Sequence, residues 1–156
     1  MSPLETNKYA NAYKKALGEY PDDKCLNISL ALCYLKLNLY DKALVAFEKA
    51  MEDNFDNSEA FFYAAVCLLK GKKAFLQPRS SIDKIIEYID AAIMIEPKGI
   101  YYYFLAYIKY DYFARKSYIT APDWEETMIY ATQAGFTDLD AARLFDILHI
   151  EKPDCL

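Results

Sequence analysis

A pattern of apolar and small residues returns along the chain at a step of 34 residues, and this step restricts the possible folds more than any other sequence feature. It is clearest between Lys24 and Asn57, where apolar positions at helical spacing lie on both sides of a turn at Asn38–Leu39–Tyr40. Equivalent positions one step apart are Tyr9 and Ala43, Tyr13 and Phe47, Ala16 and Ala50, Ala31 and Ala65, and Cys33 and Cys67. The sequence therefore predicts a series of similar helical hairpins.

The unit from Lys24 to Asn57 resembles a tetratricopeptide repeat, which is a 34-residue helix–turn–helix. The residues that carry the resemblance are Leu30, Ala31, Tyr34, Tyr40, Ala43, Phe47 and Ala50. Two positions depart from the family pattern, with Asn27 where Trp is frequent and Phe55 where Pro is frequent. The resemblance covers nearly the whole chain, and it implies an all-α fold, a right-handed α–α superhelix of about eight helices.

The same register divides a single domain, residues 1–156, into successive units. We expect a capping helix at 4–18, a repeat at 24–57, a repeat at 58–97 with an inserted loop at 71–81, a third repeat at 99–135 and a C-terminal helix at 138–149. The predicted N-caps are Asp56, with Glu59 three residues on, Ser80 for a helix at 82–95, and Thr137, with Asp140 three residues on. The last helix is similar to those that close the end of such stacks.

Size and composition indicate a folded protein. A chain of 156 residues buries ~68–70% of its unfolded surface, and a hydrophobic content of 54% with 15 Tyr and 9 Phe argues against disorder. The net charge of −5 gives no general attraction to nucleic acid or to anionic membranes. The apolar runs at 60–69 and 100–108 are shorter than a membrane span needs.

The four cysteines favour a reducing compartment. No two of them form a CxxC pair, which argues against a zinc site and a disulfide framework. The first ten residues lack the basic and apolar regions of a secretory signal. We therefore expect reduced thiols and a cytoplasmic protein.

Nothing in the sequence has the pattern of a catalytic, cofactor or metal site. His149 is the only histidine and follows the last predicted helix, where an interaction with the helix dipole explains it. The acidic pairs Asp22–Asp23 and Glu125–Glu126 fall where helices begin. Gly71–Lys72 lacks the remaining residues of a phosphate loop. The sequence predicts no enzyme and no cofactor.

In the family, the first helix of each repeat lines a concave groove that holds peptides. The residues that the resemblance places in this groove are Ile28, Leu32, Leu35, Phe62, Tyr63, Val66, Leu69, Tyr103, Tyr107 and Tyr110. One subgroup grips chaperone carboxylates with Lys, Asn and Arg on these helices, but Ile28, Leu32 and Tyr63 stand at the matching positions here. An apolar, aromatic groove on an acidic protein of this size is instead similar to secretion chaperones of the tetratricopeptide class.

Two functions remain open at this point. The groove binds a peptide or an apolar segment of a partner protein, and the chain is an adaptor or is chaperone-like. Alternatively, the groove is filled by the chain's own termini or by a second copy, and the chain is structural or self-associating. No nucleic acid or membrane partner is expected in either case.

The inserted loop carries positive charge without acidic residues. Its cations, with one adjoining lysine, are Lys70, Lys72, Lys73 and Arg79. One interpretation is a solvated loop without further role. The other is a contact for an acidic partner, because loops longer than the family norm often carry binding.

Overall fold

The computed structural model describes residues 2–53 and 55–156, and within these ranges it contains eight α-helices and no strand. The helices are α1 (Pro3–Glu19), α2 (Lys24–Lys36), α3 (Tyr40–Asp53), α4 (Ser58–Leu69), α5 (Arg79–Ile95), α6 (Gly99–Ile108), α7 (Trp124–Gln133) and α8 (Asp138–Leu148). Shorter turns are the 3-10 helix η1 (Ala74–Leu76), the π-helical turn η2 (Lys109–Phe113) and the 3-10 helix η3 (Ala114–Lys116). The expected all-α fold is confirmed.

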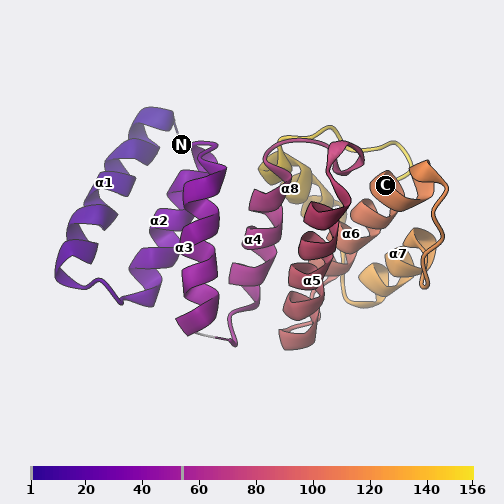
Figure 1. Ribbon diagram of the computed structural model, residues 1–156, viewed down its shortest axis with the longest axis horizontal. Coiled ribbons are helices and arrows are strands. Elements are labelled where there is room, and N and C mark those ends of the chain that lie inside the picture. Colours follow the sequence, from indigo (N-terminus) through magenta and orange to yellow (C-terminus); the bar gives the residue numbers. More distant parts are fainter. Residues whose placement is uncertain (1, 54) are drawn as a thin grey trace.

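Helices α1 to α7 pack in chain order, each against the next. In Figure 1 the row begins with α1 at one end of the long axis and reaches α7 at the other. Where the connection between two helices is short, the helices run antiparallel, and their apolar faces then cover one another. This consecutive pairing is the arrangement that the 34-residue step predicts.

Side-chain caps define most helix starts. Asp23 accepts a hydrogen bond from the backbone N–H of Leu26 at 3.0 Å, and Thr137 forms the expected capping box with Asp140. The cap of α4 is Asn57, whose side-chain oxygen accepts from the N–H of Ala60, so the prediction of Asp56 as this cap was wrong by one residue. Asn is as good a cap as Asp, and spacing alone does not separate the two.

The prediction for the start of α5 was also wrong. The helix begins at Arg79, directly after Pro78, so Ser80 lies inside the first turn and makes no cap. The irregular part of the insert therefore ends at Pro78 and not at residue 81. The ring of Pro78 holds φ at −68°, and the chain enters the helix from an extended conformation without a side-chain cap.

Helices α4 and α6 are the centre of the core. Eight of the ten residues of α6 are buried, on all sides of the helix, and eight of the twelve residues of α4 are buried. Tyr101, Tyr103 and Tyr107 of α6 are among the largest fully buried side chains. A helix that is apolar on all sides has to be covered on all sides.

The last helix does not close the stack, which corrects the expectation from the sequence. Its main contacts are with α6 and α4, the first helices of two hairpins, and not with α7, which precedes it. After α7 the chain turns back, and α8 lies beside α4 and α6 (Figure 1). This turn brings Phe136 so close to α6 that only a residue without a side chain fits at Gly99.

The buried and exposed cysteines fall as the repeat register implies. Cys33 and Cys67 are buried, Cys25 and Cys155 are exposed, and all four are free thiols. Burial raises the pKa of the Cys67 thiol to about 12, so it stays protonated and unreactive. Among the described residues, no helix has the length and apolar character that a membrane crossing requires.

The return of the chain at Gly99 gives a test of the fold. A Cβ at this position would lie 2.4 Å from the backbone nitrogen of Phe136, so Gly99→Ala should lower the free energy of unfolding by about 1–3 kcal/mol. Gly18, near the end of α1, is the control, because a Cβ there meets nothing within 4 Å. Gly18→Ala should raise stability by about 0.5–1 kcal/mol. Urea unfolding measures both, and equal effects would contradict this packing.

Candidate functional site

The groove predicted from the sequence is largely closed. Six of its ten residues are buried, namely Leu35, Phe62, Val66, Leu69, Tyr103 and Tyr107, and the other four, Ile28, Leu32, Tyr63 and Tyr110, are half-buried. Five of the buried six cannot touch a partner while the chain holds this conformation, and Leu35 is accessible only where it lines a cleft. The half-buried four do not form one surface, because Tyr110 lies near the tail of the chain, away from the cleft that Leu32 and Tyr63 line.

The chain's own C-terminal part covers the α6 side of the concave face. The ring of Phe136 stacks on Tyr103 with 4.2 Å between centroids. Phe145 of α8 meets Tyr103 and Tyr107 edge to face, at 6.0 and 5.2 Å. Aromatic pairs in these geometries contribute about 0.5–1.5 kcal/mol beyond the area that they bury. Over α6, the concave face is thus occupied by the C-terminal segment.

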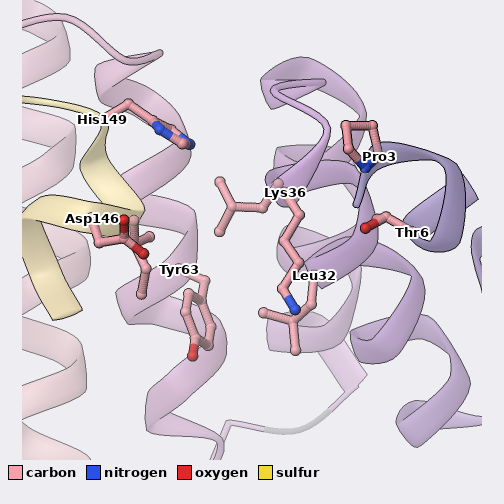
Figure 2. Close-up of a pocket in the computed structure, with 9 residues that line it drawn as sticks. Pro3, Thr6, Leu32, Lys36, Tyr63, Asp146 and His149 are labelled. Atoms are coloured by element: carbon pink, nitrogen blue, oxygen red, sulfur yellow. The ribbon is translucent and has the colours of Figure 1, made fainter. Parts of the chain in front are cut away.

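What remains open is a cleft of about 590 Å³ between the α1–α2 pair and the α4–α8 pair. Figure 2 shows Pro3 and Thr6 of α1 on one side of it with Leu32 and Lys36 of α2, and Tyr63 of α4 opposite. The full lining is Pro3, Thr6, Leu32, Leu35, Lys36, Tyr63, Asp146, Ile147 and His149. The cleft therefore keeps three of the predicted groove residues, Leu32, Leu35 and Tyr63.

Both apolar and polar side chains line this cleft. Tyr63 is held in place, since its ring stacks on Phe47 at 5.4 Å and meets Phe62 edge to face at 5.2 Å. Burial, and then the nearby Glu59 carboxylate, raise the pKa of Tyr63, so its hydroxyl stays neutral. Exposed charges from Lys36 and Asp146 lie on opposite walls. This arrangement suits an apolar group with polar atoms at its edge.

Sequence reasoning missed the other six lining residues, and three of these, Asp146, Ile147 and His149, belong to α8 and its end. These three reach the cleft only because α8 folds back, and no local pattern signals that return. His149 ends α8 in the left-handed region, at φ 55°, which turns the chain away from the helix axis. The prediction that it merely follows the last helix is correct, but it also lines the cleft.

The four cations of the insert have different surroundings. Lys70 pairs with Asp41 at 3.1 Å, and Arg79 pairs with Asp83 at 2.9 Å. Lys72 and Lys73 are exposed, and neither has an ion-pair partner within residues 2–53 and 55–156. Only these two are free to meet an acidic partner without breaking an existing pair.

A buried hydrogen-bond network holds the insert between α4 and α5 against the end of α6. The Tyr107 hydroxyl accepts a hydrogen bond from the N–H of Ala74 at 3.1 Å, and Asp111 accepts one from the N–H of Phe75 at 2.9 Å. Asp111 is 2% exposed, and it also accepts from the Tyr107 hydroxyl and from Arg115. A buried carboxylate is tolerated because each of its oxygens has a donor. The insert is thus a fixed surface and not a loose loop.

The part of the chain that the structure describes contains no group of three or more His, Cys, Asp or Glu side chains that could hold a metal ion. The thiol of Cys155 and the imidazole of His149 are both exposed, at the C-terminal end of the chain.

A tetratricopeptide repeat family model matches residues 10–61, which span the second half of α1, the α2–α3 hairpin and the start of α4. No curated protein matches the chain. The match agrees with the central unit identified from the sequence and does not extend to the later hairpins. Tetratricopeptide repeats generally mediate protein–protein interactions and are usually not catalytic.

The network at Asp111 yields a prediction for stability. Asp111→Ala leaves the N–H of Phe75 and the hydroxyl of Tyr107 with fewer partners, so the free energy of unfolding should fall by about 1–3 kcal/mol. Amide exchange at Ala74 and Phe75, followed by NMR, should become faster. Asp83→Ala is the control, since it removes only an exposed pair and should change little. Unchanged exchange at Phe75 in Asp111→Ala would show that the insert is held by other contacts.

Proposed function

We propose that this protein is a protein-interaction module, an adaptor or chaperone-like protein, that holds a short apolar segment of a partner in the cleft between the α1–α2 pair and the α4–α8 pair. The observation that carries the proposal is the cleft itself, which has apolar walls and a volume of about 590 Å³. Pockets of ~300–1,000 Å³ with apolar walls and a few polar groups are the usual form of a binding site.

The lining indicates the chemistry of the segment. Leu32, Leu35 and Ile147 favour Leu, Ile or Phe side chains, which exclude water from these walls. Lys36 and His149 on the rim provide donors for backbone carbonyls of the bound segment. Because α8 already covers α6, the bound segment has to be short and cannot run along the whole concave face.

Self-association is the second candidate. The observation in its favour is that the α6 side of the groove is already filled by the chain's own Phe136 and Phe145. In this view a second copy fills the cleft, and no other partner is needed. The four free thiols support action in a reducing compartment such as the cytoplasm in either case.

Selection from a random-peptide display library against the whole protein tests the first proposal. Enriched peptides should carry apolar residues, and Leu32→Asp should weaken their binding by about thirtyfold, which is ~2 kcal/mol. Ile147→Asp, on the opposite wall, should have a similar effect. Val45→Asp is the matched control, because Val45 is 69% exposed on α3 and does not line the cleft.

Light scattering and thermal melts on the same variants separate the alternatives. The proposal expects Leu32→Asp to keep its mass and its fold while losing the peptide. A wild-type dimer that Leu32→Asp converts to a monomer would favour self-association instead. Selected peptides that bind both cleft variants as tightly as wild type would remove the cleft as the binding surface.

A further inference from the structure

We propose that a second surface, at the edge of the molecule next to the cleft, binds an acidic segment of a partner protein. We name it the basic edge, and it consists of Lys72, Lys73, Arg115, Lys116 and Lys152. It brings together the insert between α4 and α5, the η3 turn after α6, and the tail that follows α8. In Figure 1 the insert and the tail run along the same edge of the molecule.

Two of the five charges of the basic edge, those of Arg115 and Lys116, are held in fixed positions. The Arg115 guanidinium is bonded to the buried Asp111 at 2.6 Å and lies 4.4 Å from the centre of the Phe75 ring. The Lys116 ammonium lies 4.9 Å from the same ring and 3.9 Å from the ring of Tyr112. Contacts between cations and aromatic rings hold long side chains in place, so less entropy is lost when an acidic group binds.

Most of this charge is not neutralised by neighbours. Within the described ranges, Lys72, Lys73, Lys116 and Lys152 have no ion-pair partner. The chain as a whole carries a net charge of −5, so the sign of charge at this cluster of unpaired cations is opposite to that of the molecule as a whole. Complementary charge speeds encounter and selects acidic partners over neutral ones.

The surface is also hollowed. Two depressions, of about 510 and 370 Å³, share Lys73, Arg115 and Glu151 in their linings. Together they make a continuous track from the insert to the tail, and Leu76, which is 68% exposed, borders the first of them. An exposed leucine beside unpaired cations fits a segment that combines Asp or Glu with an apolar residue.

The tail supplies acidic groups of its own to this track. Glu151 lines both depressions and Asp154 lines the second, although neither forms an ion pair there within the described ranges. These two carboxylates repel an acidic partner and compete with it for the same cations. Neutralising them should therefore strengthen binding.

Fluorescence anisotropy with a short fluorescein-labelled peptide of Glu and Leu residues, titrated with the whole protein, tests the proposal. Lys72→Glu with Lys73→Glu should weaken binding at least tenfold and reduce its dependence on salt. The control is Lys8→Glu with Lys15→Glu, which changes the net charge equally on exposed positions of α1. Equal losses in the two double variants would overturn the proposal, because binding would then follow net charge alone.

Two further measurements locate the site. Glu151→Gln with Asp154→Asn should tighten binding of the peptide more than Glu19→Gln with Asp22→Asn, a matched pair of exposed acids near the end of α1. No difference between these two pairs would contradict a site at the tail. An oligothymidylate that bound the basic edge more tightly than the peptide would also overturn the proposal, since it would assign the surface to a nucleic acid.

Discussion

The need to cover α6 on every side determines the arrangement of the rest of the C-terminal half. Its tyrosines at 101, 103 and 107 are fully buried, and each aromatic side chain of this size removes ~150–250 Å² from water. Helices α5 and α7 cover two sides of α6, as in any row of antiparallel helices. The concave side would stay exposed without another element. The fold-back of α8, with Phe136 and Phe145 against Tyr103, supplies that cover.

This cover changes what the concave face can do. A tetratricopeptide groove open along its length would offer a track for an extended peptide, whereas here the α6 end is filled and a short cleft remains beside α2. His149 connects the two surfaces that are left, because it lines both the cleft and the first depression of the basic edge. A partner with an apolar anchor and a neighbouring acidic stretch would fit both surfaces at once.

The helices could be predicted from the sequence because local information specifies them. Apolar spacing places α2, α3 and α4, and the Thr137–Asp140 box marks the start of α8. The exact starts of α4 and α5 were predicted less accurately, as the caps at Asn57 and Pro78 show. The position of α8 could not be predicted, since spacing records which face of a helix is apolar and not which helix covers it.

The same limit applies to the candidate site, because the sequence indicates which residues face the concave side and not which segments cover them. Leu32 and Tyr63 could be assigned to the concave face from the sequence, because each occupies a fixed position in its repeat. The burial of Tyr107 depends on Phe145, and the burial of Phe62 depends on Tyr101 and Phe104, each more than thirty residues further along the chain. The role of Asp111 in holding the insert was equally invisible, since it joins Phe75 across a separation of 36 residues.

NMR distance contacts between aromatic rings report whether α8 lies against α6 on the concave face. With 4.2 Å between their ring centroids, Tyr103 and Phe136 should give strong nuclear Overhauser cross-peaks, and Phe145 should give weaker ones to Tyr103 and Tyr107. Absence of all three, together with cross-peaks from α8 to α7, would show that α8 does not cover α6 and that the groove is open.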